Sequence, residues 1–381
     1  MAKILGIIGG GQLGMMITEA AKKMPEEISE IIVLDPTENC PASQVGATQI
    51  IGDFKDKDAI IELANKSDII TYEIESGDSD VLKSVESKSE INPSPETLKI
   101  IQDKFLQKSF LLENGILVPE FIEINDIEDI KSGIKKFGLP AMLKARRDAY
   151  DGRGNFKINS ESDVQKAYDY FKGQPLLLEK FVPFSMEVSV IASRNTHGQI
   201  KTYPLVENIH EDNILRETIA PARVSEIITK KAELIAEKTM TVLKGAGIFG
   251  IEMFVTADDN IVINEIAPRV HNSGHHTLQS SETSQFEQHL RAILGLELGS
   301  TKLICNSIMY NILGSEEFTG EYNPLKISES GVFLKMYGKK ISKPMRKLGH
   351  INIIGENGES IDTLLEILQR IKPKTVVKPS K

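Results

Sequence analysis

The stretch Ile4–Met16, ILGIIGGGQLGMM, places three glycines directly after an apolar run. Gly9, Gly11 and Gly14 have the spacing G-x-G-x-x-G, and Asp35 ends the next apolar run. A strand followed by three glycines at this spacing, with an acid about 20 residues further on, is the fingerprint of a dinucleotide-binding Rossmann-like domain. One hypothesis for the chain is therefore an NAD-binding oxidoreductase or sensor built on this segment.

Around this stretch, residues 3–90 alternate between strand-like and helix-like patterns. This order predicts parallel strands joined by crossover helices, with functional loops at the C-terminal ends of the strands. Two such loops are Gly9–Gly14 and the segment TYEIES, which contains Glu73. The expected strands are Lys3–Ile8, Ile31–Leu34, Thr48–Ile51 and Asp68–Tyr72, and expected helices include Leu13–Met24 and Asp56–Asn65.

Composition narrows the class of protein. The net charge of −9 argues against a surface for nucleic acid or membranes, and no run approaches the ~20 apolar residues of a membrane span. The apolar N-terminal run is too short for a signal peptide and lacks a cleavage pattern. Cys40 and Cys305 are far apart, which favours a reduced, cytoplasmic protein.

The length of 381 residues suggests two or three domains. The segment INPSPETLKIIQDK, with two prolines before a helix, predicts a boundary. The runs PAMLKARRD, PLLLEKFV and MEVSVIASR then predict strands, and Glu226–Leu243 predicts a long helix. We expect a Rossmann-like domain at 1–95, a second α+β domain at 96–299, and a small, mostly β domain at 300–381.

A hairpin is expected for GIFGIEMFVT and IVINEIAP, with its turn at residues 257–260. A turn centred between Asp258 and Asp259 places Glu252 opposite Glu265, with Cβ atoms ~5 Å apart. Paired carboxylates among apolar neighbours suit Mg²⁺, which prefers oxygen ligands and phosphates. A turn shifted by one residue would instead leave one glutamate buried and the other exposed. The first register pairs Glu252 with Glu265, Phe254 with Ile263, and Thr256 with Ile261.

Two lysines and a glycine-rich loop are candidates for phosphate binding. Lys144 ends an apolar strand, and the following loop carries Arg153 between Gly152 and Gly154. Such a loop can bring backbone N–H groups to phosphates, although it could also be a plain hairpin turn. Lys104 lies on an expected helix and could equally be a surface lysine. The segment from Glu179 to Val182 could hold an adenine or form an edge strand.

Taken in order, these features resemble the ATP-grasp superfamily, whose members activate a carboxylate with ATP and bind Mg²⁺ on paired acids. More specific segments, in colinear order from Lys3 to His350, resemble the N5-carboxyaminoimidazole ribonucleotide synthetases. The segments are GGGQLGMM, LDPTENCPASQVG, TYEIE, YDGRGN, YPLVENIHEDNILRETIAPA, INEIAPRVHNSGHHT and MRKLGH. The resemblance implies an ATP-grasp fold with an N-terminal Rossmann-like domain and a small C-terminal, mostly β domain.

The resemblance also implies a reaction. 5-Aminoimidazole ribonucleotide (AIR), bicarbonate and ATP would give N5-carboxyaminoimidazole ribonucleotide (N5-CAIR), ADP and phosphate. Either carboxyphosphate or CO₂ released from it would carboxylate AIR. The cofactors would be ATP and Mg²⁺, without biotin or NAD. The enzyme would be a homodimer that passes its product to the N5-CAIR mutase in purine biosynthesis.

Family residues carried over by the resemblance form three groups. Glu252 and Glu265 would bind the metal, and Arg269, His271, Tyr150 and Lys339 would act in catalysis. His271 could either orient bicarbonate or move a proton, and His275 would add a cation. The AIR site would comprise Gln12, Leu13, Glu73, Tyr150, Asp151, Arg153, Lys339 and Arg346. The ATP site would comprise Lys104, Lys144, Asp148, Ala149, Tyr150, Asp151, Gly152, Arg153, Gly154, Glu179, Lys180, Phe181, Val182, Glu187, His210, Asn264 and Glu265.

Several details of this set are open. In a regular strand, Asn264 would face away from Glu265, and the H-x₃-H spacing of His271 and His275 could suggest zinc but lacks a helical context. Asp148 and Ala149 replace the two glycines usual in the family loop, which predicts a stiffer loop, and Met345 replaces a glycine. A formate-dependent glycinamide ribonucleotide transformylase is the nearest alternative enzyme, and a non-catalytic nucleotide-binding regulator is another.

Overall fold

The apolar run that precedes the three glycines lies at the centre of the first lobe. In the computed structural model, which describes residues 1–148 and 154–380, this run is the middle strand of a five-stranded parallel sheet of order β3-β2-β1-β4-β5. The predicted parallel arrangement is therefore confirmed. The strands are β1 Lys3–Ile8, β2 Ile28–Asp35, β3 Thr48–Ile51, β4 Ile69–Tyr72 and β5 Glu90–Ile91, and the helices are α1 Gln12–Ala21, α2 Pro41–Gln44, α3 Lys57–Lys66 and α4 Ser79–Val85.

The first lobe shares its core with a distant part of the chain. Alternate side chains of a strand point to opposite faces, so Leu5 and Ile7 pack on the side of α1, whereas Ile8 packs on the side of α3. Helix α11 (Gln285–Ile293) joins the α1 side with Phe286 fully buried. The packing therefore continues across the boundary expected near residue 95.

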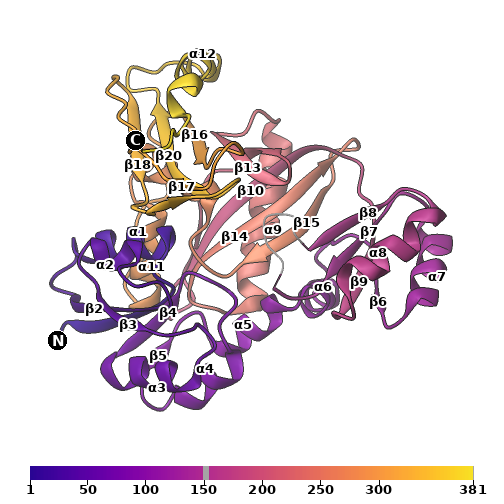
Figure 1. Ribbon diagram of the computed structural model, residues 1–381, viewed down its shortest axis with the longest axis horizontal. Coiled ribbons are helices and arrows are strands. Elements are labelled where there is room, and N and C mark those ends of the chain that lie inside the picture. The colour runs from indigo at the N-terminus through magenta and orange to yellow at the C-terminus, as the bar shows by residue number, and fades with distance from the viewer. Residues whose placement is uncertain (149–153, 381) are drawn as a thin grey trace.

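A second lobe, at the right of Figure 1, contains a four-stranded antiparallel sheet of order β6-β9-β7-β8. Helices α7 (Ile127–Phe137) and α8 (Val164–Phe171) cover it with a shared apolar core. Strand β9, which contains Glu179, lies between two neighbours, so the edge-strand alternative for this segment is wrong. The strands are β6 Phe121–Ile124, β7 Ala141–Ala145, β8 Asn155–Ile158 and β9 Leu176–Lys180.

The largest sheet has nine strands within the described residues and runs through the centre of the molecule (Figure 1). Its order is β15-β14-β10-β12-β13-β16-β20-β18, with β11 beside β10. Helix α9, with its predicted bounds Glu226–Leu243, packs on it. The strands are β10 Phe184–Arg194, β11 Ile200–Thr202, β12 Val206–Glu211, β13 Ile214–Ala220, β14 Gly247–Thr256, β15 Ile261–Ala267, β16 Ser307–Leu313, β18 Val332–Met336 and β20 Lys347–Ile354.

The C-terminal region extends this sheet. Strands β16, β20 and β18 continue it from β13, while β17 (Gly320–Glu321) and β19 (Ile341–Ser342) form a separate pair. Helix α12 (Ile361–Ile371) covers the extension. The region after residue 300 is rich in strands as predicted, but hydrogen bonds join it to the central sheet.

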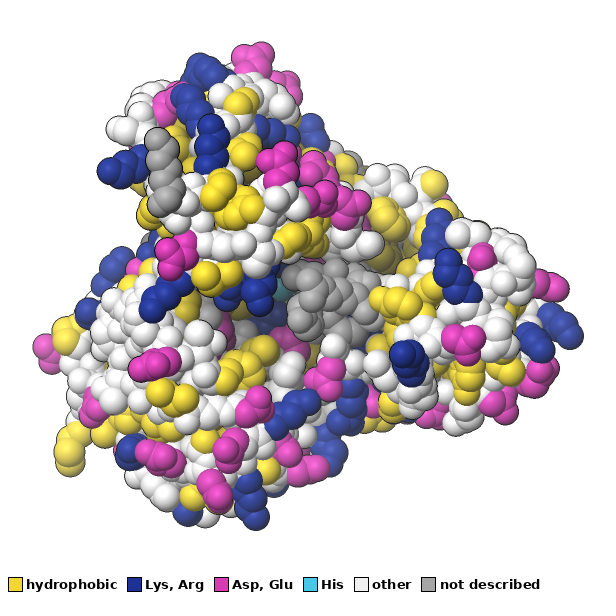
Figure 2. Space-filling model, viewed as in Figure 1, with side chains coloured by type: hydrophobic (Ala, Val, Ile, Leu, Met, Phe, Trp, Pro, Cys, Tyr) yellow, Lys and Arg dark blue, Asp and Glu magenta, His cyan; other side chains and the backbone are white. Residues whose placement is uncertain are grey.

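The first lobe, the second lobe and the C-terminal region surround a hollow, and Lys or Arg side chains line its visible wall (Figure 2). Helices α5 (Pro95–Gln102) and α6 (Lys104–Glu113) connect the first lobe to the second. Among the described residues, no helix combines the length and the apolar character needed to cross a membrane.

Candidate active site

The β14–β15 hairpin places Glu252 directly opposite Glu265, as predicted, although the predicted register near the turn is wrong. Phe254 pairs with Val262 rather than Ile263, and Ile261 pairs with Val255 rather than Thr256. A β-bulge between Glu252 and Met253 shifts the register by one residue, with Asn264 as the extra residue on β15. The bulge restores the pairing of the two glutamates.

The bulge also changes where Asn264 points. We expected its side chain on the face opposite to Glu265, but the strand is not regular at this point. The Oδ1 atom of Asn264 accepts a hydrogen bond from Lys144 Nζ at 3.4 Å, and Glu265 Oε1 lies 2.5 Å from Lys104 Nζ. Both residues therefore reach one cluster of lysines.

The lysine cluster consists of Lys104 and Lys108, one turn apart on α6, and Lys144 on β7. The buried carboxylate of Glu179 lies between two of them, 3.0 Å from Lys108 Nζ and 2.7 Å from Lys144 Nζ. Burial alone would raise the pKa of Glu179, but these two lysines lower it to about 2. Three lysines facing fewer acids leave positive charge suited to phosphates.

Lys108 was missed by sequence reasoning. The residue is 1% exposed, its Nζ donates to the backbone oxygen of Asn264 at 3.0 Å, and burial lowers its pKa to about 8. The available signal was the i, i+4 spacing from Lys104, which puts both side chains on one face of the helix.

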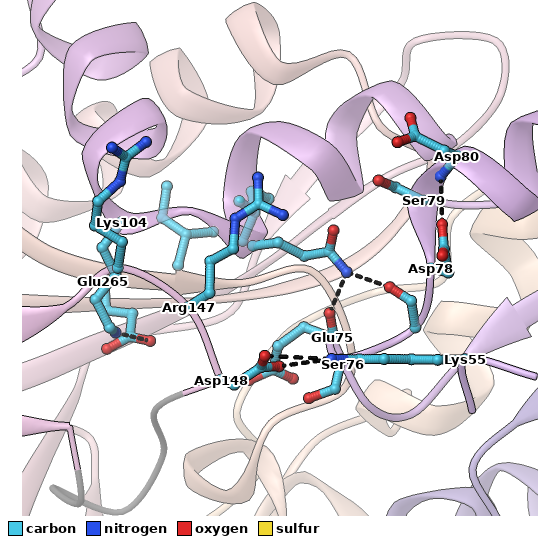
Figure 3. Close-up of a pocket in the computed structure, with 15 residues that line it drawn as sticks. Lys55, Glu75, Ser76, Asp78, Ser79, Asp80, Lys104, Arg147, Asp148 and Glu265 are labelled. Atoms are coloured by element: carbon cyan, nitrogen blue, oxygen red, sulfur yellow. Dashed lines mark hydrogen bonds and ion pairs between the residues drawn. The ribbon is translucent and has the colours of Figure 1, made fainter. Parts of the chain in front are cut away.

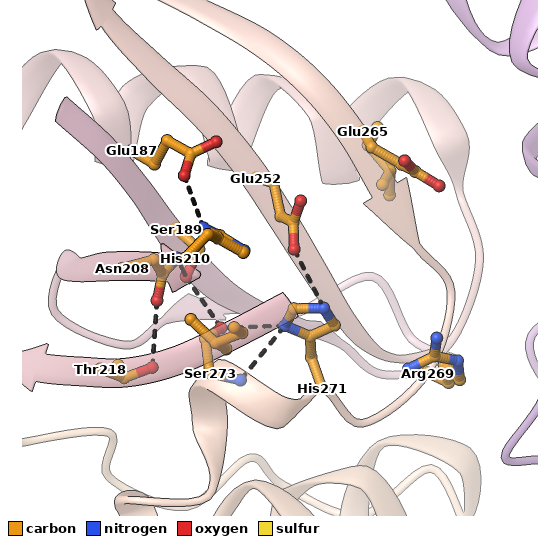
Figure 4. Close-up of polar contacts among 12 residues, drawn as sticks. Glu187, Ser189, Asn208, His210, Thr218, Glu252, Glu265, Arg269, His271 and Ser273 are labelled. Atoms are coloured by element: carbon orange, nitrogen blue, oxygen red, sulfur yellow. Dashed lines mark hydrogen bonds and ion pairs between the residues drawn. The ribbon is translucent and has the colours of Figure 1, made fainter. Parts of the chain in front are cut away.

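Glu252 pairs with His271, which lies in the segment that follows β15 (Figure 4). His271 Nε2 lies 3.3 Å from Glu252 Oε1. Burial would raise the pKa of Glu252, but the hydrogen bond from His271, helped by His210 and Lys104, lowers it to about 2. The carboxylate is therefore ionised at neutral pH.

The two hairpin glutamates fit a magnesium ion that is shared with a nucleotide. They present oxygen donors on adjacent strands, and among the described residues no group of three or more His, Cys, Asp or Glu is placed to enclose an ion. A site with two protein carboxylates leaves the other positions to phosphate oxygens and water, as Mg²⁺ prefers.

Arg269, expected to act in catalysis, is held by a carboxylate from the first lobe. Its Nε lies 2.5 Å from Glu75 Oε2, and its Nη2 lies 3.1 Å from Glu75 Oε1. Burial would raise the pKa of Glu75, but the charge and hydrogen bonds of Arg269 lower it overall. Glu75 was also missed, although it lies two residues after Glu73 in TYEIES. A fork–fork pair of this kind fixes the guanidinium plane.

A cavity of about 220 Å³ lies beside this region (Figure 3). Lys104 and Glu265 line it from the second lobe and central sheet, and Glu75 lines it from the first lobe. Asp148 reaches its rim, where it pairs with Lys55 at 3.2 Å. The cavity thus lies between the β14–β15 hairpin and the loop that ends at Asp148.

The glycine loop of the first lobe is filled by the chain's own acids. Glu73 accepts hydrogen bonds from the backbone N–H groups of Gly11 at 2.5 Å and Gly14 at 2.7 Å, and Asp35 accepts from Gly10 at 2.8 Å. These donors are the ones that a pyrophosphate would need in a dinucleotide site. In this conformation, internal carboxylates occupy the position of that anion.

Profiles of three domain families match the chain. The ribonucleotide synthetase preATP-grasp domain matches residues 1–102, the ATP-grasp domain 109–286, and the phosphoribosylaminoimidazole carboxylase C-terminal domain 307–363. The N5-carboxyaminoimidazole ribonucleotide synthase of Bacillus subtilis (strain 168) is 40% identical over 92% of this chain and 91% of that protein. The chain belongs to the N5-carboxyaminoimidazole ribonucleotide synthetase family.

Other members of the synthetase family agree in structure. The crystal structure of N5-carboxyaminoimidazole synthase from Aspergillus clavatus, in complex with ADP and AIR, has a TM-score of 0.89 and 34% identity, covering 98% of this chain and 99% of that one. The phosphoribosylaminoimidazole carboxylase of Ogataea methanolica is 41% identical over 97% of this chain but only 69% of its own length. The ATP-grasp fold with its two flanking domains is therefore confirmed.

Only some of the residues that the synthetase resemblance assigned to AIR lie in contact with one another. Gln12 Oε1 accepts a hydrogen bond from Lys339 Nζ at 2.7 Å, which joins the first lobe to the C-terminal region beside Glu73. The side chain of Leu13 is buried in the apolar core. Arg346 donates to the Ile341 carbonyl oxygen within its own loop.

His210, expected in the ATP site, and His275, expected to add a cation, have different environments. His210 Nδ1 lies 2.5 Å from Glu187 Oε2; burial would lower the pKa of His210, but this carboxylate raises it. His275 is fully buried, and burial together with His350 lowers its pKa well below the usual range. The expectation that His275 supplies a cation is therefore wrong.

The remaining predicted residues of the ATP site lie along the second lobe. Lys180 pairs with Glu120 at the surface, Lys157 Nζ lies 4.3 Å from the centroid of the Phe181 ring, and Val182 is partly exposed. The Gly154 carbonyl oxygen accepts from Ala145 N at 2.8 Å. Five predicted positions lie outside the described residues, namely Ala149, Tyr150, Asp151, Gly152 and Arg153.

Proposed function

We propose that this protein carboxylates AIR with bicarbonate at the expense of ATP, giving N5-CAIR, ADP and phosphate in purine biosynthesis. The observation that carries the proposal is the pairing of Glu252 with Glu265 next to the lysine cluster. Two carboxylates and three lysines together suit a magnesium nucleotide. Because the chain belongs to the synthetase family, we infer that bicarbonate accepts the phosphoryl group.

In this proposal Lys104 and Lys144 would bind the ATP phosphates, and Glu252 and Glu265 would hold Mg²⁺. The ion, when bound, would offset charge on the β- and γ-phosphate oxygens. Glu179 keeps Lys144 in place, because their 2.7 Å contact is buried. Glu187 and His210, with the segment from Glu179 to Val182, would bind the nucleoside.

The proposed chemistry has two steps, a phosphoryl transfer and a carboxylation. A bicarbonate oxygen attacks the γ-phosphorus, the bond to ADP breaks, and carboxyphosphate forms. The amine of AIR then attacks the carboxyl carbon, either of carboxyphosphate, with phosphate as the leaving group, or of CO₂ after phosphate has left, and the nitrogen gives up one proton. Arg269 and His271 would bind the bicarbonate, since a guanidinium and an imidazole N–H both suit its oxygens. Tyr150 remains a predicted contributor to this step.

The AIR site would lie where the first lobe meets the C-terminal region. The contact of Lys339 with Gln12, beside Glu73, brings a cation and polar groups from both segments together. The Aspergillus clavatus enzyme was solved with ADP and AIR, which supports a shared site for both ligands. Asp151, Arg153 and Arg346 complete the proposed set.

The assembly and setting of the enzyme are proposals from the family resemblance. We expect a cytoplasmic homodimer whose product is consumed by the N5-CAIR mutase. Sedimentation velocity at micromolar concentration should give twice the mass of the 42.2 kDa chain. A single species at the mass of one chain would contradict the homodimer.

The test of function is a substrate-omission assay. ADP release should require AIR and bicarbonate together, and ¹³C-bicarbonate should enter the product as a carbamate carbon. Turnover driven by glycinamide ribonucleotide and formate would support the transformylase alternative instead. Calorimetry with NADH and with Mg·ATP separates the oxidoreductase hypothesis, which predicts binding of NADH. A regulator without catalysis would tolerate Glu265→Gln.

A further inference from the structure

A chain of buried polar side chains leads from the central sheet to His271. Thr218 Oγ1 donates to Asn208 Oδ1 at 3.1 Å, and Asn208 Nδ2 donates to Ser189 Oγ at 2.9 Å. Ser189 Oγ donates to Ser273 Oγ at 2.8 Å, and Ser273 Oγ lies 2.9 Å from His271 Nδ1. The first four of these residues are at most 5% exposed (Figure 4).

Two observations, one at the Asn208 end of the chain and one at the His271 end, show which atom donates in each hydrogen bond. Each hydroxyl has a single hydrogen, and Ser189, which accepts from Asn208, uses its own on Ser273. Ser273 then has its hydrogen left for His271 Nδ1. Independently, the backbone N–H of Ser273, which can only donate, points at Nδ1 at 3.3 Å. Nδ1 is therefore an acceptor.

The ring itself has little freedom to turn. His271 N donates to Gln285 Oε1 at 2.9 Å, and Gln285 Nε2 donates back to the His271 carbonyl oxygen at 2.7 Å. The ring also lies against Gly250, where an added Cβ would come within 2.5 Å of His271 Cγ. Nε2 therefore faces the hairpin, 3.3 Å from Glu252 Oε1.

We propose that Ser273 is a positioning residue that holds His271 as the Nε2–H tautomer, so that His271 donates a hydrogen bond to the reacting bicarbonate and does not accept its proton. In a neutral imidazole only one nitrogen carries hydrogen, and Nδ1 is already the acceptor of two donors. If Nε2 acted as a general base, its lone pair would be free and the single ring hydrogen would be on Nδ1. That hydrogen would then point at the Ser273 N–H, which is also a donor. The donor role rests on the proposed function, whereas the tautomer does not.

The tautomer is measured directly by long-range ¹H–¹⁵N correlation on protein labelled with ¹⁵N-histidine, with and without Mg·ADP. The signals are assigned by comparison with His271→Gln. Nδ1 of His271 should give the resonance of an unprotonated nitrogen and Nε2 that of an N–H. Ser273→Ala loses the hydroxyl donor but keeps the backbone N–H, so it should show a minor population of the Nδ1–H tautomer beside the Nε2–H tautomer. A protonated Nδ1 in the unmodified protein would overturn the proposal, whatever reaction the enzyme catalyses.

Kinetics then test the donor role. Ser273→Ala should lower kcat about tenfold, the worth of a single hydrogen bond, with KM for ATP unchanged. Ser193→Ala is the matched control, because Ser193 is equally buried on β10 but donates to the Lys201 carbonyl oxygen. Ser189→Ala, one step further from the ring, should have a smaller effect than Ser273→Ala. An unchanged kcat in Ser273→Ala, with the fold intact by circular dichroism, would contradict the positioning role.

A second pair of variants separates donor from base. Glutamine can place an amide N–H near the position of His271 Nε2 but cannot act as a base at neutral pH. His271→Gln should therefore keep at least about a tenth of kcat, whereas loss of a general base typically costs 100-fold or more. His271→Ala gives the level without either function. If His271→Gln falls to the level of His271→Ala, the donor role is wrong even though the tautomer stands.

Discussion

Lys108 is a buried cation that links three elements at the scale of a single residue. Its amine contacts Glu179 on β9 and the Asn264 carbonyl oxygen on β15, while its backbone belongs to α6. A buried carboxylate is costly unless it is paired. Lys108 therefore allows Glu179 to be buried and to hold Lys144 with its second oxygen.

Replacing Lys108 should destabilise the protein in a pH-dependent way. Lys108→Met should lower the free energy of unfolding at pH 7 by about 3 kcal/mol, because Glu179 loses one partner. The folded pKa of about 8 lies below the ordinary 10.5, so the unfolded chain binds more protons between these values. The contribution of Lys108 to stability therefore rises with pH from 8 to 10.5.

Urea unfolding at pH 7.5, 8.5 and 9.5 tests this sign. The difference in free energy between the natural protein and Lys108→Met should grow with pH. Lys166→Met, at an exposed position of α8, is the control and should show no such trend. A difference that stays constant or shrinks with pH would contradict the account of the lysine cluster.

The hairpin glutamates should be essential for turnover. Glu252→Gln or Glu265→Gln should lower ATP turnover by about 100-fold or more, since a metal ion contributes several kcal/mol to such a transition state. Asp259→Asn makes the same change of charge at the exposed turn of the hairpin and should leave turnover intact. EDTA should abolish turnover and Mg²⁺ restore it. Rates near normal in both glutamine variants would rule out the metal-binding hairpin.

The glycine loop shows what an element-scale motif does and does not determine. The spacing correctly predicts a tight strand-to-helix turn between β1 and α1, but the anion in that turn is Glu73 from the end of β4. A Cβ on Gly11 would lie 2.5 Å from Glu73 Oε1, and one on Gly14 would lie 2.4 Å from the Gly9 oxygen. The glycines make room for a contact within the chain.

Gly14→Ala should therefore open the turn. The clash involves a backbone oxygen, which cannot move aside cheaply, so we expect a loss of about 1–3 kcal/mol in the free energy of unfolding, the usual cost of overpacking. Gly77→Ala is the control, because its Cβ would meet nothing nearer than 3.9 Å. Thermal unfolding, monitored by circular dichroism, compares the two variants. Equal melting temperatures would show that the turn accommodates the added methyl group without cost.

The β14–β15 hairpin shows that the sequence predicts which residues form strands but not their register. Alternation of apolar residues identified both strands, and β1, β3 and α9 have their predicted bounds. The bulge at Asn264 could not be predicted, because one extra residue in a strand leaves the local apolar pattern nearly unchanged. The predicted Glu252–Glu265 pair was correct only because the turn and the bulge differ from expectation by compensating single residues.

At the scale of the whole molecule, the site is assembled by contacts between lobes. Glu75 on the first lobe holds Arg269 after β15, and Gln12 on α1 holds Lys339 in the C-terminal region. Such pairs join residues far apart in sequence, so no local pattern reveals them. Family motifs predicted Arg269, Gln12 and Lys339, whereas Glu75 and Lys108 have partners far away in the sequence that only the fold brings near.

Removing the lobe-to-lobe pair should weaken catalysis more than nucleotide binding. Glu75→Gln should lower kcat, because Arg269 loses its fixed plane, and should cost about 2 kcal/mol of stability, typical of a hydrogen bond between charged groups. KM for ATP should change little. Glu62→Gln, which breaks an exposed pair with Lys66 on α3, is the control and should stay within about 0.5 kcal/mol. A Glu75→Gln enzyme with unchanged kcat would show that the pair has no catalytic role.

Transfer of an oxygen atom tests the central claim most directly. The enzyme is mixed with ¹⁸O-labelled bicarbonate, AIR and Mg·ATP, quenched within a single turnover, and the phosphate is analysed by mass spectrometry. If bicarbonate attacks the γ-phosphorus and AIR then takes the carboxyl carbon, each phosphate should carry one bicarbonate oxygen. Phosphate without the label, formed while ATP is consumed, would contradict the proposed reaction.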